Sequence, residues 1–166
     1  MPMLDAYIPE GALAPSDEKE LVSKLTDILL EWEGADPANP VARSIAWVFV
    51  HRPTEVYVGG EVPDEPRYRI VASVPEGQLD ARRRQGMVEA VTKAVLDAEP
   101  EDRSHDPSRI WVFASSVLEG TWGGGGRIVG LADIATFVLD GDAAAGKAHA
   151  KRRLAAAKAE RDAIFS

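Results

Sequence analysis

Residues 44–49 read Ser44-Ile45-Ala46-Trp47-Val48-Phe49, and a close copy follows 64 residues later as Ser108-Arg109-Ile110-Trp111-Val112-Phe113. Three more blocks return in the same order at offsets of 65 or 66 residues: 7–11 as 73–77, 25–29 as 91–95, and 57–60 as 122–125. Four blocks in one order at nearly one spacing indicate a duplicated unit of about 65 residues.

The first unit is expected to form strand, helix and strand. Residues 3–8 are an apolar run that ends at a Pro-Glu-Gly turn, and residues 45–50 are rich in β-branched and aromatic side chains. Between them, a helix is predicted to begin near Ser16 as its N-cap. Its apolar stripe has helical spacing and consists of Leu21, Leu25, Ile28, Leu29 and Trp32. Residues 56–58 and a Gly-Gly turn predict a short hairpin arm.

The second unit repeats this pattern with a strand over 68–74, a helix over 80–98 and a strand over 110–114. A strand–helix–strand unit with a helix-length crossover places its two strands parallel. The predicted class is therefore α/β (α+β): two β-α-β units forming a four-stranded sheet with both helices on one face. Such a sheet leaves its other face uncovered, and the usual remedy is burial against other subunits.

Composition sets further bounds on the 166-residue chain. Residues 1–140 carry 13 basic and 24 acidic side chains, while residues 141–166 carry 6 and 3. We therefore expect one domain over 1–140, with units 2–66 and 67–130, followed by a helical Ala/Lys/Arg-rich extension over 141–166, its helix covering 142–165. The acidic body argues against nucleic acid as a partner.

Other classes of site and location are disfavoured by what the sequence lacks. There are no cysteines and no apolar run of 18 residues, so no thiolate metal site and no membrane span are expected. Neither metal-ligand spacing nor a nucleotide-binding glycine loop is present, which predicts no metal and no cofactor. Cytoplasm is the expected location, because a signal peptide pattern is also missing.

Pro2 is the candidate catalytic residue. Removal of Met1, which is usual before a small residue, leaves Pro2 with a free secondary amine at the start of the first strand. A terminal amine titrates at roughly pH 8, and burial lowers that value. Such an amine serves as a general acid, a general base or a nucleophile at neutral pH. A retained Met1 converts the same nitrogen into an amide without basicity.

The terminal proline, the tandem β-α-β units and the glycine-rich segment 119–126 together resemble the tautomerase superfamily, in its 4-oxalocrotonate tautomerase-like form. The resemblance covers residues 2–130. The segment 51–56, His-Arg-Pro-Thr-Glu-Val, looks like one found in the branch of malonate semialdehyde decarboxylase and cis-3-chloroacrylic acid dehalogenase. The resemblance implies a homotrimer, with Pro2 in a pocket near a subunit boundary.

The same resemblance suggests which residues bind the substrate. Trp122, before four glycines, is either a pocket wall or the plug of a hairpin; Trp111 lines the site or belongs to the core. Arg127 and Arg69 are the candidates for holding a carboxylate, which arginine binds through paired hydrogen bonds. The arginines that family members use after the Glu-Gly turn, in the second strand and near the second helix are missing, since Ala12, Gln78, Trp47 and Trp111 stand there.

The sequence thus predicts a tautomerase that uses Pro2 as acid and base on a small keto-enol or unsaturated carboxylic acid. A second interpretation is a Pro2-dependent hydratase, dehalogenase or decarboxylase acting on a three-carbon acid. A third is a catalytically silent tautomerase fold that serves in assembly or binding.

Overall fold

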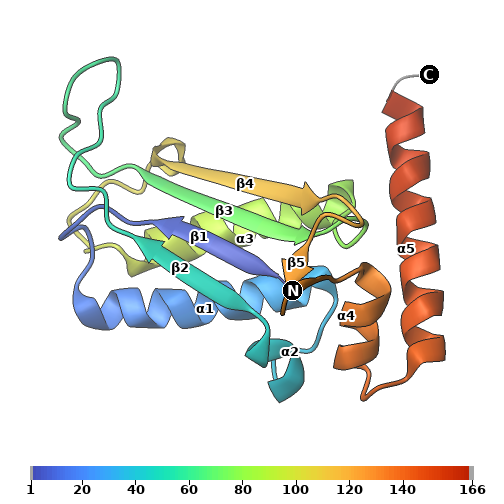
Figure 1. Cartoon of the computed structure of the whole chain (residues 1–166). Helices are drawn as coiled ribbons and strands as arrows, with labels where there is room; N and C mark the ends of the chain where they lie inside the picture. Colours follow the sequence, from blue (N-terminus) through green and yellow to red (C-terminus); the bar gives the residue numbers. More distant parts are fainter. Residues whose placement is uncertain (1, 165–166) are drawn as a thin grey trace.

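A mixed four-stranded sheet forms the centre of the computed structural model, which describes residues 2–164 (Figure 1). Its strand order is β2-β1-β3-β4. Each half of the duplication contributes two strands and the helix between them, as predicted. The elements are β1 (Met3–Tyr7), α1 (Pro15–Glu33) and β2 (Trp47–His51) in the first half, and β3 (Tyr68–Pro75), α3 (Ala81–Ala98) and β4 (Ile110–Val117) in the second.

The two halves meet head to tail. Strands β1 and β2 pair in parallel, as do β3 and β4, which confirms the crossover argument. The central pair β1–β3 is antiparallel, with Met3 opposite Ser73 and Tyr7 opposite Arg69. Equivalent positions of the two units therefore lie at opposite ends of the sheet.

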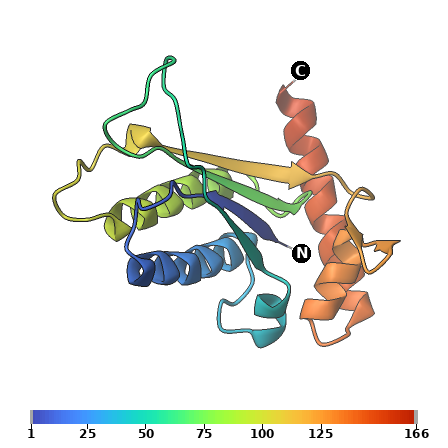
Figure 2. The ribbon, with the colours of Figure 1, turned by 60° about the vertical axis from the view of Figure 1, so that its left-hand side comes forward.

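Helices α1 and α3 cover one face of the sheet and leave the other open, as predicted (Figure 2). Alternate strand residues point to the helices, so that Leu4, Ala6, Ile70 and Ala72 are almost fully buried. On the open face, four large aromatic side chains are 44–67% exposed: Trp47, Phe49, Trp111 and Phe113. Of the two alternatives for Trp111, a place in the core is therefore wrong for the single chain.

The helix starts follow different local rules. Helix α1 begins at Pro15 with Ala14 as N-cap and no side-chain cap, so the prediction of Ser16 as N-cap is wrong. Proline suits the first helical position because its fixed φ is already helical and its missing N–H has no partner there. Helix α3 has a side-chain cap, since the Asp80 carboxylate accepts a hydrogen bond of 2.9 Å from the Arg83 backbone N–H.

Several short elements were not predicted. They are the helix α2 (Pro40–Ser44), the 3-10 turn η1 (Pro107–Arg109) and the helix α4 (Leu131–Val138). The glycine-rich hairpin expected after the last strand of the sheet is formed by the strands β5 (Gly123–Gly124) and β6 (Arg127–Ile128). The hairpin arm predicted near residues 56–60 is a single bridge between Val58 and Glu61.

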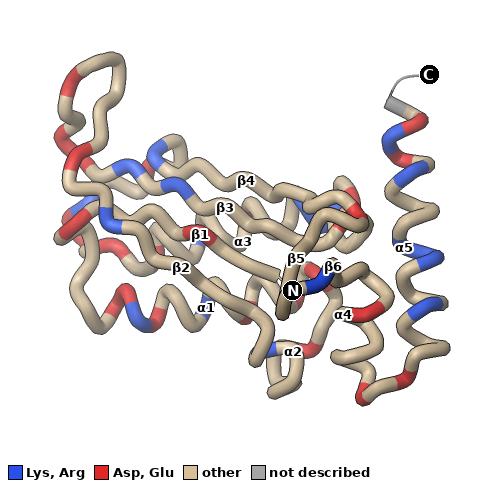
Figure 3. The backbone as a smooth tube through the Cα atoms, in the orientation of Figure 1, with Lys and Arg blue, Asp and Glu red and all other residues tan. Residues whose placement is uncertain are grey.

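The predicted C-terminal helix is present as α5 (Ala143–Ile164), which packs against α4 beside the end of the sheet (Figure 1). The last predicted residue, Phe165, lies outside the described residues. In Figure 3, the Lys and Arg positions, in blue, are spaced along the backbone of this helix. Within residues 2–164, no helix is long and apolar enough to cross a membrane.

Candidate active site

Pro2 is buried at the start of β1, where two hollows of the molecule meet. Its carbonyl oxygen accepts a hydrogen bond of 3.2 Å from the Trp47 backbone N–H, which fixes the residue before β1 against β2. On one side lies an open cleft of about 820 Å³. On the other lies a smaller cavity of about 140 Å³, enclosed by helices. Pro2 lines both.

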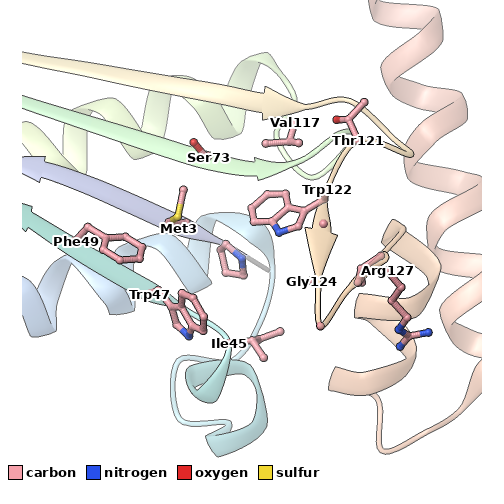
Figure 4. Close-up of a pocket in the computed structure, with 14 residues that line it drawn as sticks. Met3, Ile45, Trp47, Phe49, Ser73, Val117, Thr121, Trp122, Gly124 and Arg127 are labelled. Carbon is pink, nitrogen blue, oxygen red and sulfur yellow. The ribbon is translucent and has the colours of Figure 1, made fainter.

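The glycine-rich hairpin forms one wall of the cleft. Strands β5 and β6 are joined by Gly125 and Gly126, whose φ angles of 60° and 77° belong to the left-handed region that glycine adopts without strain. A hydrogen bond of 2.9 Å from Val129 N–H to the Trp122 carbonyl oxygen closes the hairpin. Trp122 therefore projects into the cleft from a rigid support (Figure 4).

The opposite wall is aromatic. Trp47 and Phe49 project from β2 toward the same space, and their ring centroids lie 6.2 Å apart in an edge-to-face arrangement. Ser73 and Thr121 bring hydroxyl groups. In the described part of the chain, Arg127 is the one charged side chain that lines the cleft. The cleft thus suits a small molecule with an apolar body and one anionic group.

The smaller cavity behind Pro2 has a polar side. Helix α1 brings Glu33, the turn before α3 brings Gln78, and α5 brings His149. His149 Nε2 and Gln78 Oε1 are 3.0 Å apart, so the C-terminal helix is bonded directly to a residue beside the cavity. The remaining lining comes mainly from apolar side chains of α2 and α4, such as Ala42, Ile134 and Val138.

Glu33 is the most unusual group of the site. Its side chain is 6% exposed, and its Oε1 atom is buried without a hydrogen-bond partner among residues 2–164. Burial raises the pKa of Glu33 to about 8, while the positive charges of the chain's N-terminal amine and of Arg83 hold it from rising further. At neutral pH an isolated Glu33 is therefore largely uncharged.

Two of the predicted substrate-binding residues share the cleft with Pro2, and two do not. Trp122 and Arg127 line it. Arg69 and Trp111 line another cavity of about 610 Å³ at the far end of the sheet, because the antiparallel register sets Arg69 opposite Tyr7. There the Arg69 guanidinium lies 4.8 Å from the centre of the Tyr7 ring and 5.6 Å from that of Phe113.

The motif at residues 51–53 supports the sheet rather than the cleft. His51 Nε2 lies 2.7 Å from an Asp5 carboxylate oxygen, and Arg52 forms two hydrogen bonds of 2.6 Å with Glu18. Arg43 is paired with Asp27 in the same way. Since each of these side chains already has an acidic partner, none is placed to receive a ligand at Pro2.

Sequence reasoning missed the polar residues behind Pro2. A signal for Glu33 was available: it continues the buried series Leu25 and Leu29 at a spacing of four, where an apolar residue is expected. Gln78 and His149 gave no such signal, because 71 residues separate them and only the docking of α5 brings them together.

Known proteins resemble this chain in structure rather than in sequence. No protein-family model matches the sequence, and no curated protein matches it. Among solved structures, the crystal structure of native fused 4-OT matches with a TM-score of 0.60 at 20% identity, over 76% of this chain and 94% of that one. The chain has the tautomerase fold.

Two further structures support this assignment of the tautomerase fold. N1, a member of the cis-3-chloroacrylic acid dehalogenase family, matches with a TM-score of 0.60 at 14% identity, over 76% of this chain and 82% of the other. The macrophage migration inhibitory factor of Toxoplasma gondii matches with a TM-score of 0.58 at 15% identity, over 76% and 99%. At these identities the likeness establishes the fold.

Proposed function

We propose that the chain is a tautomerase in which the amine of Pro2, freed by removal of Met1, moves a proton on a small keto-enol or unsaturated carboxylic acid. The observation that carries this proposal is the position of Pro2: the second residue of the chain is buried and lines a mostly apolar cleft of about 820 Å³. An amine in such surroundings loses part of its hydration, which disfavours the charged form and lowers its pKa toward neutral pH.

The reaction follows from this placement. The neutral amine takes a proton from an enol oxygen or from a carbon next to a carbonyl group, and the resulting ammonium returns it to another atom of the same substrate. The double bond shifts and the amine is regenerated, so no cofactor is consumed. Trp122 forms the wall against the apolar part of the substrate, and Arg127 pairs with its carboxylate.

The other two candidates, Arg69 and Trp111, can take part in this reaction only if several chains assemble. Within one chain, Arg69 and Trp111 line the cavity at the far end of the sheet from Pro2. We infer that the chain forms a homotrimer that covers the open sheet face. In that trimer they contribute to substrate binding at a neighbour's Pro2 cleft.

The proposal is tested by the intact mass of the purified protein together with ketonisation of an enol-pyruvate. We expect a mass without Met1, and a loss of kcat of at least about 100-fold in Pro2→Ala, the scale of acid–base catalysis. Pro15→Ala is the matched control, because Pro15 is an exposed proline at the start of α1. A retained Met1, or equal rates in Pro2→Ala and wild type, contradicts the proposal.

A covalent probe provides a second measurement. The structure of Pt0534 inactivated by 2-oxo-3-pentynoate matches this chain with a TM-score of 0.60 at 16% identity. An alkynyl keto acid accepts addition of a free amine, so we expect it to label the N-terminal peptide of this chain at Pro2. Label on other residues, or no label, argues against a reactive amine in the cleft.

A second enzymatic proposal uses the same residue in its protonated form, for hydration, dehalogenation or decarboxylation of a three-carbon acid. Likeness in fold to N1 of the dehalogenase family favours testing it. Turnover of 3-chloroacrylate or malonate semialdehyde, with little ketonisation, identifies this chemistry. Absence of all three activities in a protein lacking Met1 identifies a silent scaffold.

A further inference from the structure

The cavity behind Pro2 contains a carboxyl group that the surrounding protein leaves without a partner. Glu33 is only 6% exposed, and its Oε1 atom has no hydrogen bond within residues 2–164. An unpaired carboxyl group buried in this way costs several kcal/mol unless a neighbouring group compensates it. Glu33 and Pro2 line the same cavity of about 140 Å³.

The other charged and titratable groups around this cavity are committed elsewhere or uncharged. The Arg83 guanidinium donates to two backbone carbonyl oxygens, those of Glu33 at 3.1 Å and Gln78 at 3.0 Å, rather than to the Glu33 carboxyl group. His149 is bonded to Gln78, and burial together with nearby arginines lowers its pKa, which favours the neutral ring. The packed side chains of α4 are apolar.

The pKa values of the two groups lie in one range. Burial brings the pKa of Glu33 to about 8, and a terminal amine titrates at about 7.7–8.0 before any effect of its surroundings. Two groups with similar pKa values exchange a proton at little cost in free energy. In a chain that has lost Met1, a positive charge on the Pro2 amine and a negative charge on Glu33 would stabilise each other across the cavity that both residues line.

We propose that Glu33 is the positioning residue that controls the protonation state of the Pro2 amine from behind, across the cavity that they share. This inference rests on the proposed function, since it requires a free amine at Pro2. In this arrangement the substrate reacts with Pro2 in the cleft, and Glu33 in the smaller cavity sets whether the Pro2 amine is protonated.

The proton balance of the pair is simple. In one state Pro2 is an ammonium and Glu33 a carboxylate; in the other the N–H bond has broken, an O–H bond has formed on Glu33, and both groups are neutral. One proton is held in either state. The cavity has room for a water molecule to carry the proton between them, since about 10–15 Å³ suffices for one water.

The decisive measurement is the titration of the Pro2 nitrogen in protein labelled with 15N-proline. Of the 11 prolines, only a terminal Pro2 carries a nitrogen that titrates. In Glu33→Gln the carboxylate that stabilises the ammonium is gone, so we expect the pKa of Pro2 to fall by about one to three units. The acidic limb of the pH profile of kcat/KM for ketonisation, along which the amine loses its proton and becomes the active base, is expected to move to lower pH by the same amount.

Glu31→Gln is the matched control, because Glu31 lies two residues earlier on α1, is exposed, and loses the same charge. Its titration and pH profile are expected to overlay those of the wild type. Unfolding temperatures near wild type for both variants confirm that the fold is intact; if Glu33→Gln does not fold, Glu33→Met tests the same loss of charge.

The outcomes separate the inference from the function on which it rests. An unchanged pKa of Pro2 in Glu33→Gln, with catalysis retained, overturns the role of Glu33 and leaves the tautomerase proposal standing. A protein that keeps Met1 shows no titrating proline nitrogen at all and overturns both.

Discussion

In the part of the chain that the structure describes, Arg127 is the only charged side chain that lines the Pro2 cleft, and it has no acidic partner. It leaves the hairpin one residue after Gly126, on the short strand β6. A guanidinium group without an acidic partner beside an apolar cleft can bind the carboxylate of a substrate. Loss of the Arg127 charge is therefore expected to weaken substrate binding.

Substitution of Arg127→Gln is expected to raise KM for a carboxylate substrate by about 10- to 100-fold with a smaller effect on kcat. The reason is the loss of charge-assisted hydrogen bonds worth about 1.5–3 kcal/mol. Steady-state kinetics measure it, with Arg82→Gln on the surface of α3 as control. If KM is unchanged in Arg127→Gln, the substrate carboxylate is bound by another cation.

Glu76 shows how one residue of the repeat gained a role that its counterpart lacks. Its carboxylate accepts a hydrogen bond of 2.9 Å from the Glu119 backbone N–H and pairs with Arg161 on α5. These contacts lower the pKa of Glu76, the backbone hydrogen bond most of all. The counterpart in the first unit, Glu10, is exposed.

Because the folded-state pKa of Glu76 lies below its ordinary value of 4.5, the carboxylate stabilises the fold above that pH, and the contribution is lost as the pH falls through the folded-state value. We expect Glu76→Gln to be less stable than wild type at pH 7, and we expect this difference in stability to be smaller at pH 3. Denaturant unfolding at both values measures this. Glu10→Gln is the repeat-matched control, and a constant difference for Glu76→Gln at both pH values contradicts the prediction.

At the scale of elements, the Pro-Glu-Gly turn after β3 is the docking point of α5. Arg153 of α5 donates a hydrogen bond of 2.6 Å to the Gln78 carbonyl oxygen, and Arg84 of α3 lies 2.9 Å from Glu160. Gly77 in this turn lies so close to α5 that a Cβ atom would be 2.9 Å from the backbone carbon and oxygen of Arg153. The turn and the helix fit only because this residue is glycine.

The repeat provides a matched pair of variants for this contact. Gly77 and Gly11 occupy equivalent turns with φ angles of 88° and 73°, but a Cβ atom on Gly11 would meet nothing within 4 Å. Alanine at either position carries the cost of a left-handed backbone, about 1–2 kcal/mol. We expect Gly77→Ala to lose more stability than Gly11→Ala and to release α5, seen as faster amide exchange and proteolysis over residues 143–164. Equal losses, with α5 protected in both, argue against this docking.

At the scale of the whole molecule, the exposed aromatic face of the sheet requires a cover. Trp111 and Phe113 are 67% and 44% exposed on β4, and Trp47 and Phe49 are exposed on β2, at the opposite edge of the same sheet face. Large aromatic side chains exposed on one sheet face are typical of a subunit interface. The R7 fused 4-OT, which has the same fold at 14% identity, is described as an asymmetric trimer.

We expect the purified chain to sediment as a trimer near three times 17.9 kDa. Trp111→Asp places a charge on the face and is expected to shift the protein to monomer. Phe137→Asp, on α4 and 53% exposed, is the control that leaves the trimer intact. A wild-type monomer at all concentrations contradicts the assembly.

The sequence by itself determined the duplicated architecture. Apolar periodicity and the repeat blocks are local properties, and they predicted the two halves, the parallel pairs within each half and the single helical layer. It also singled out Pro2 and Trp122, because a terminal proline and a tryptophan before four glycines are visible without any contact map.

Only the tertiary structure decided which residues surround Pro2. The antiparallel pairing of β1 with β3 places Arg69 opposite Tyr7, at the end of β1 that is far from Pro2. The cavity with Glu33, Gln78 and His149 likewise exists because α1, the β3–α3 turn and α5 converge there. Strand direction and helix docking depend on contacts between distant segments, and such contacts leave no periodic signal in the chain.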